Sequence, residues 1–164
     1  MISNTKEEKL ETLIVNYLQR NNGYELGSNI DYNKEYAIDE NRLFKFLKET
    51  QPEKLQILGV LSSEMNKVKF LNKLQDKIIK DGIINVLRNG FKIYPVNLDL
   101  YYLIPTEENS KAAELYSKNI FSVIRQLKYS RDNTKFAIDC VIFINGLPII
   151  TCEFKNNLNK TKFR

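Results

Sequence analysis

Two carboxylates and a lysine interrupt the most apolar part of the sequence, near its C-terminus. Asp139 lies in the run 135–144, and Glu153 and Lys155 lie in the run 149–155. Both runs are rich in Ile, Val and Phe and are separated by an Asn-Gly turn signal, which predicts an antiparallel hairpin. Carboxylates are ligands that Mg²⁺ prefers, and a nearby lysine can orient a water or stabilise negative charge on a phosphate.

The pairing register of this hairpin decides whether the two acids share a face of the sheet. Because side chains alternate along a strand, a strict two-residue loop would set Asp139 opposite Cys152 and send the acids to opposite faces. An odd loop, such as 145–147 with a bulge, pairs Asp139 with Glu153 and Cys140 with Cys152. We expect the odd register, because it gathers the charged groups on one face and leaves the other face to apolar side chains.

In the odd register, the two acids predict a divalent metal site. Residues directly opposite each other have Cβ atoms about 5 Å apart, so Asp139 and Glu153 can bind one Mg²⁺ that also keeps waters and a phosphate oxygen. Two adjacent carboxylates repel each other unless a cation lies between them. With Lys155 on the same face to activate water, the set indicates metal-assisted phosphodiester hydrolysis. The alternative is that these charges only cover a solvent-facing sheet surface.

The same hairpin resembles the nuclease motif of one protein family. Asp139, then Glu-x-Lys fourteen positions later, with the Phe-Ile-Asn-Gly-Leu-Pro segment between them, resembles the restriction (motor) subunit of type I restriction-modification enzymes. That nuclease domain belongs to the PD-(D/E)XK superfamily. Ile138 stands where the superfamily name expects proline, a departure that leaves the acidic metal ligand in place. Segments that also look like this family's N-terminal part are 46–53, 82–88, 99–102 and 125–130.

This resemblance implies a fold, a reaction and partners. The fold is α/β, a mixed β-sheet flanked by helices, with a restriction-endonuclease-like core preceded by a helical N-terminal half. The activity is magnesium-dependent cleavage of foreign double-stranded DNA, in a complex with methyltransferase (M) and specificity (S) subunits. Asp139 and Glu153 would bind Mg²⁺ and Lys155 would help to activate water. ATP would act only through motor domains that translocate DNA.

The family also predicts parts that this sequence lacks. No Gly-x-x-x-x-Gly-Lys-Ser/Thr motif is present, and no Gln-x-x-x-Tyr motif follows Lys155. We therefore expect residues 1–164 to be an N-terminal endonuclease fragment without ATPase motor domains, with a helical part over about 1–90 and the catalytic sheet over about 91–155. Such a fragment is expected to cut DNA weakly or not at all.

Two further charged residues are additional candidates for the site. Glu8 and Glu11 lie one turn apart on a predicted amphipathic helix, where solvated surface is the alternative interpretation. In the superfamily the first helix sometimes offers an extra acid, so Glu11 is retained. Arg125 lies in the middle of a predicted strand and either contacts phosphate or forms a structural ion pair with Asp99 or Glu114.

Other functions compatible with the sequence are a catalytically silent nuclease-fold module that docks partner subunits, and a repair nuclease of the same superfamily. Intact Asp139, Glu153 and Lys155 argue against the first, because docking requires none of them. The likeness along the helical first half argues against the second.

Composition limits the class of protein. The 164 residues are enough for one domain with a real core, and 43% hydrophobic with 27% charged residues indicates a globular chain. The absence of histidine excludes histidine-based triads and the HExxH zinc motif. A net charge of +5 suits a polyanionic partner. The absence of a long apolar run or signal peptide favours the cytoplasm, with both cysteines reduced. The resemblance implies that this is the cytoplasm of a bacterium or archaeon.

Periodicity places the expected elements along the chain. The predicted helices span 5–19, 40–48 with Asp39 as the cap, 52–67, 68–89 with an interruption at Gly82, and 109–118. The predicted strands span 91–96, 99–104, 121–129 and the two halves of the hairpin, and 24–37 is expected to be a loop. Basic side chains on the helices between 52 and 89 are solvated surface or, as the less favoured alternative, a phosphate-tracking patch: Lys67, Lys69, Lys73, Lys77, Lys80 and Arg88.

Overall fold

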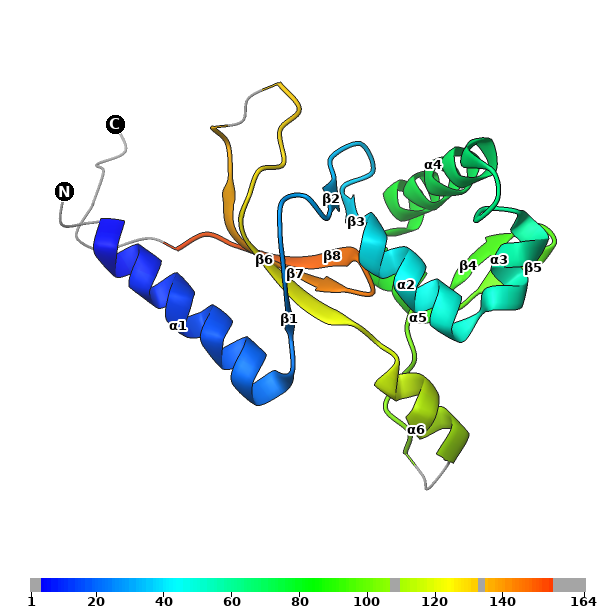
Figure 1. Cartoon of the computed structure of the whole chain (residues 1–164), viewed down its shortest axis with the longest axis horizontal. Helices are drawn as coiled ribbons and strands as arrows, with labels where there is room; N and C mark the ends of the chain where they lie inside the picture. The colour runs from blue at the N-terminus through cyan, green and yellow to red at the C-terminus, as the bar shows by residue number, and fades with distance from the viewer. Residues whose placement is uncertain (1–3, 107–109, 133–134, 155–164) are drawn as a thin grey trace.

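A four-stranded mixed sheet forms the centre of the molecule (Figure 1). The computed structural model describes residues 4–106, 110–132 and 135–154. The strand order is β1-β6-β7-β8, with β1 parallel to β6 and the other neighbours antiparallel. Helices flank this sheet, so the predicted α/β class is confirmed. The strands are β1 (Glu25–Gly27), β6 (Phe121–Leu127), β7 (Ile138–Ile144) and β8 (Leu147–Cys152).

Helices and two small hairpins account for the other regular elements. The helices are α1 (Asn4–Asn22), α2 (Glu40–Thr50), α3 (Pro52–Leu58), α4 (Glu64–Asp81), α5 (Ile83–Asn89) and α6 (Ser110–Ser117). The hairpins pair β2 (Tyr32–Asn33) with β3 (Ile38–Asp39), and β4 (Phe91–Ile93) with β5 (Val96–Leu98). In the part of the chain that the structure describes, no helix is long and apolar enough to cross a membrane.

Local signals explain most helix boundaries. The Asp39 carboxylate accepts the Arg42 backbone N–H and caps α2, as predicted. Pro52 begins α3 in its first turn, where a missing N–H costs nothing. Gly59 and Gly82 adopt positive φ angles of 64° and 81°, so the chain leaves α3 and α4 at these points.

Three expectations need correction. The predicted loop 24–37 contains β1 and β2, because strands of two or three residues are too short to show a period. The predicted helix 52–67 ends at Leu58, since Gly59 takes the left-handed conformation that closes it. The predicted strand 99–104 carries no strand; the chain turns back earlier, from β4 into β5.

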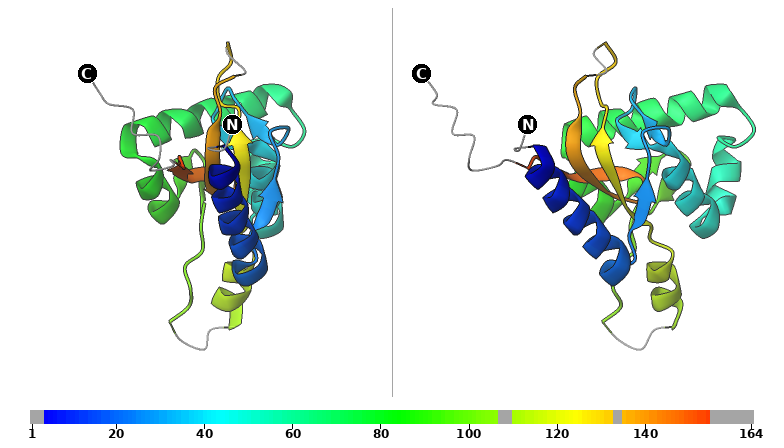
Figure 2. Two further views of the ribbon diagram at one scale, coloured as in Figure 1. Left: turned by 90° about the vertical axis from the view of Figure 1, so that its left-hand side faces the viewer. Right: turned by 60° about the vertical axis from the view of Figure 1, so that its left-hand side comes forward.

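Two parts of the molecule pack independently around the sheet. The largest apolar cluster joins α2–α5 with the β4–β5 hairpin, and it includes Phe46, Phe70 and Leu98. Helix α1 lies at the other end of the molecule (Figures 1 and 2) and places Val15 against Val123 and Cys140 of the sheet. Helix α1 thus covers one sheet face near the ends of β7 and β8.

The face that α1 buries differs from the one its apolar pattern suggests. Leu10, Leu13 and Tyr17 are 47%, 66% and 58% exposed, whereas Glu11 and Val15 are 3% and 2% exposed. An acid therefore occupies the helix face that packs on the sheet.

Candidate functional site

The β7–β8 hairpin adopts the predicted odd register as far as its last pair, Cys140 with Cys152. Asn145 and Gly146 form its two-residue turn with positive φ angles of 50° and 81°, as a type I′ turn requires. A β-bulge then leaves Ile149 without a partner and shifts the register by one residue. The two-residue turn and this bulge together give the odd register in the rest of the hairpin. The predicted pairing of Cys140 with Cys152 is confirmed. The pairs are Ile144 with Leu147, Phe143 with Pro148, Ile142 with Ile150, Val141 with Thr151, and Cys140 with Cys152.

Tertiary contacts hold the turn of this hairpin in place. The buried Asn145 side chain accepts the Ile120 N–H at 2.6 Å and donates to the Leu100 carbonyl oxygen at 2.9 Å. The Gly146 carbonyl oxygen accepts the Asp39 N–H at 2.8 Å. The turn is therefore anchored on both sides, and its anchoring fixes the positions of the residues at the far end of the two strands.

Asp139 lies at that far end, partly buried on β7. Its Oδ2 accepts the Phe154 N–H at 2.7 Å, and its Oδ1 accepts Gln126 Nε2 at 3.2 Å. The first contact holds the chain just beyond β8 against the Asp139 carboxylate. Glu153, the neighbour of Phe154, is exposed there and makes no ion pair with the described residues. Lys155 lies outside the described residues.

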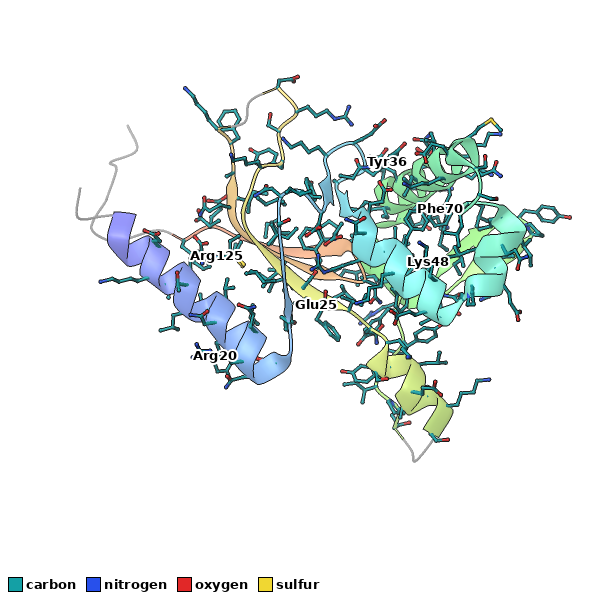
Figure 3. The ribbon with its side chains drawn as sticks, in the orientation of Figure 1. Arg20, Glu25, Tyr36, Lys48, Phe70 and Arg125 are labelled. Carbon is teal, nitrogen blue, oxygen red and sulfur yellow. The ribbon has the colours of Figure 1, made fainter. Side chains whose placement is uncertain are left out.

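Glu11 and Arg125, the two additional candidates, form an ion pair between α1 and the sheet. Glu11 is 3% exposed, so the alternative of solvated surface is wrong. Its Oε1 accepts Arg125 Nε at 2.5 Å, and Arg125 Nη2 donates to Thr12 Oγ1 at 3.0 Å. The predicted structural partners of Arg125, Asp99 and Glu114, are also wrong. Figure 3 shows Arg125 in the space between α1 and the sheet.

Gln126 is a site residue that sequence reasoning missed. Its Nε2 donates to Glu11 Oε2 at 2.8 Å and to Asp139 Oδ1 at 3.2 Å, so it joins the two carboxylates. Its φ of 47° lies in the left-handed region, which costs a residue other than glycine about 1–3 kcal/mol. A glutamine in a strand carries no motif, and nothing in the sequence signals a left-handed backbone at this position.

The donor set agrees with a magnesium site in chemistry, although the described residues hold no cluster of three possible ligands. Within 4–106, 110–132 and 135–154, no group of three or more His, Cys, Asp or Glu side chains is close enough to hold a metal ion. Carboxylate oxygens of Asp139, Glu153 and Glu11 are nonetheless of the hard type that Mg²⁺ binds. The Gln126 amide fills the space between two of them.

A second charged cluster surrounds Arg42 and is fully paired. Arg42 donates to Glu25 at 2.9 Å and to Asp39 at 2.5 Å, while Asp39 is 0% exposed. Burial raises the pKa of the Asp39 carboxyl, although its hydrogen bonds from Arg42 act in the opposite direction. Because Asp39 also caps α2 and its backbone binds the Gly146 carbonyl, this cluster secures the hairpin turn.

The mixed sheet flanked by helices is an α/β fold that is consistent with a nuclease-like core. Residues 4–163 match the family described as type I restriction enzyme R protein N terminus (HSDR_N), and the chain belongs to that family. The resemblance inferred from the hairpin motif is thereby confirmed over nearly the whole chain. No curated protein and no solved structure gives a significant match.

Proposed function

We propose that this chain is the magnesium-dependent endonuclease domain of a type I restriction enzyme R subunit. It would cleave foreign double-stranded DNA by phosphodiester hydrolysis, after ATP-driven translocation in the full complex. The observation that supports the proposal is the pairing of Cys140 with Cys152, because the same register continued by one residue would set Asp139 opposite Glu153. The hydrogen bond from Phe154 N–H to Asp139 supports it, because it brings the chain at Glu153 to the same carboxylate.

Each proposed residue has a separate role. Asp139 and Glu153 would hold Mg²⁺; Asp139 Oδ2 would keep its hydrogen bond from the Phe154 N–H, and Oδ1 would exchange its hydrogen bond from Gln126 for the cation. Bound Mg²⁺ would polarise the phosphate and lower the pKa of a coordinated water. Lys155 would orient that water and stabilise the developing negative charge. Arg125 would hold Glu11, and through it α1, close to the reacting phosphate.

The partners in this proposal come from the family. Double-stranded DNA is the substrate, and M and S subunits supply methylation and sequence recognition. ATP is used by motor domains outside this chain, and the assembly works in the cytoplasm of a bacterium or archaeon.

Metal binding tests the proposal directly. Isothermal titration of the chain with Mg²⁺ should give binding that is lost in both Asp139→Asn and Glu153→Gln. Glu114→Gln on α6 removes the same charge far from the hairpin and should bind as the wild type does. In complexes of M and S subunits with an R subunit that carries both this domain and the motor domains, supplied with ATP, the two hairpin variants should abolish double-strand cleavage. Wild-type cleavage by either variant, or no Mg²⁺ binding by the wild type, would contradict the proposal.

One observation favours the alternative of a silent docking module. The Gln126 amide already satisfies Glu11 and Asp139 without a cation. The two functions differ in one measurable respect: a silent module would assemble with M and S subunits equally well in the wild type and in Asp139→Asn, and neither complex would cut DNA. The repair-nuclease alternative is disfavoured by the family match.

A further inference from the structure

A small hollow lies between α4 and the β4–β5 hairpin, away from the carboxylate site. Its volume is about 190 Å³. Figure 1 shows α4, β4 and β5 at the opposite end of the molecule from α1. The floor is apolar and consists of Leu58, Val60, Phe70 and Ile93. The rim is polar and consists of Asn66, Lys69, Lys73 and Tyr94.

The rim carries uncompensated positive charge. Lys69 and Lys73 are four residues apart on α4, so both project from the same side of the helix. Neither forms an ion pair with any described residue, whereas the α4 neighbours Lys67 and Lys77 pair with Glu40 and Asp81. No carboxylate lines the hollow. Two ammonium groups at an acid-free hollow create a local positive potential that attracts an anion.

The rim also offers an aromatic ring to solvent. Tyr94, in the turn directly after β4, is 91% exposed, while Ile93 beside it is 8% exposed and anchors the strand in the core. An exposed aromatic ring near cationic side chains is the combination with which proteins bind single nucleic-acid strands, because bases stack on the ring and phosphates contact the cations.

We propose that this hollow binds one nucleotide unit of an unpaired DNA strand, with its phosphate at Lys69 and Lys73 and its base against Tyr94. The proposed function supplies only the identity of the polymer as DNA. Contact at this end of the molecule involves none of Glu11, Asp139 or Glu153, so it needs no metal. The hollow would hold a separated strand while the carboxylate site acts elsewhere on the DNA.

Fluorescence anisotropy in EDTA tests this inference without any cleavage. The chain is titrated against a labelled single-stranded oligonucleotide of about 15 nucleotides, the upper range of sites for a single-strand module. Tyr94→Leu should weaken binding by roughly 5- to 100-fold, the range expected for the loss of one stacked base. The double variant Lys69→Gln/Lys73→Gln should weaken binding about tenfold, and the slope of log K against log salt should fall by up to about 1.4.

Two matched controls separate local contact from total charge. Lys111→Gln/Lys118→Gln, on α6 and directly after its last residue, removes the same charge. Tyr17→Leu removes a ring that is 58% exposed on α1. Both should bind nearly as the wild type does. Equal losses in the control and test variants, unchanged binding by Tyr94→Leu, or equal competition by blunt duplex would each overturn the proposal.

The result is independent of the proposed nuclease site. The titration in EDTA measures strand binding alone, and none of the residues that line the hollow belongs to the proposed metal site. If Mg²⁺ binding and cleavage fail while Tyr94→Leu still weakens strand binding, the nuclease proposal falls and the strand site stands.

Discussion

At the scale of single residues, Gln126 determines how the acidic side chains are arranged. Its amide nitrogen lies 2.8 Å from Glu11 Oε2 and 3.2 Å from Asp139 Oδ1, between two groups that would otherwise repel each other. Mg²⁺ binds oxygens at about 2.0–2.1 Å, so a cation in this place would draw both carboxylates inward. An amide and a cation cannot occupy that place together, and Mg²⁺ binding there requires the Gln126 side chain to leave.

Replacement of Gln126 tests this competition. Gln126→Ala should raise the affinity of the chain for Mg²⁺ by roughly tenfold, because a hydrogen bond to a charged group, worth about 1.5 kcal/mol, no longer has to be broken. Gln126→Lys supplies a tethered cation and should prevent Mg²⁺ binding. Titration calorimetry measures both. Gln75→Ala, which removes an amide bonded to the Glu35 carbonyl, is the control. Weaker binding by Gln126→Ala would instead show that the glutamine supports the metal site.

Cys140 makes a separate contribution that depends on pH. Burial raises the pKa of this thiol from 9.0 to about 12, and Cys152 across the strand pair adds to the shift. A raised pKa in the folded protein means that the unfolded state loses its proton first. The stabilising contribution is therefore complete below pH 9 and decreases above it, by about 1.4 kcal/mol per pH unit.

The expected outcome is a difference between two alkaline stability profiles. Between pH 9 and 10.5, the free energy of unfolding in urea should fall more steeply for the wild type than for Cys140→Val. This variant keeps an apolar side chain at the position. Both proteins share every other titrating group, so the difference isolates the thiol. Parallel profiles would mean that Cys140 ionises freely in the folded state.

At the scale of elements, the anchored turn at Asn145 and Gly146 helps to set how β7 and β8 pair, and this pairing positions the acidic residues at their far end. A Cβ on Gly146 would lie within 2.6 Å of the Leu43 nitrogen and against the Asp39 carbonyl oxygen, and the φ of 81° disfavours any side chain. The backbone of α2 thus leaves room only for glycine at this position.

Two glycine substitutions separate crowding from conformational cost. Gly23→Ala has a similar φ of 69° and nothing within 4 Å, so it should cost only about 1–2 kcal/mol. Gly146→Ala should cost more than about 4 kcal/mol or prevent folding, because backbone atoms cannot move aside. Chemical denaturation compares the two. Similar losses would mean that the hairpin can move away from α2.

These elements also mark how far sequence reasoning extends. The cap at Asp39, the helix break at Gly82 and the Cys140–Cys152 register follow from local rules, and the structure has all three. Its route to that register differs, because the bulge at Ile149 lies beyond the turn rather than within it. The strand β1 and the left-handed Gln126 depend on long-range pairing, which a local pattern cannot contain.

At the scale of the whole molecule, α1 is the weakly attached part. It buries Val15 and the Glu11 ion pair against the sheet, while Leu10, Leu13 and Tyr17 remain substantially exposed. By contrast, α4 buries Phe70, Leu71 and Leu74 in the largest core. Local opening costs least where few apolar contacts are lost, so α1 should open independently of the rest.

Hydrogen exchange should therefore show two levels of protection. Amides in the middle of α1 should exchange faster than those of α4. Val15→Ala removes about 2 kcal/mol of stabilisation from apolar burial, and it should speed amide exchange in α1 alone. Leu13→Ala removes a side chain that is 66% exposed and should leave the exchange rates of both helices unchanged. If Glu11 joins Asp139 and Glu153 at a metal ion, Mg²⁺ should slow exchange in α1 while α4 stays unchanged. Equal slowing of both helices would mean that the metal stabilises the whole fold, and no slowing of α1 would exclude Glu11 as a ligand.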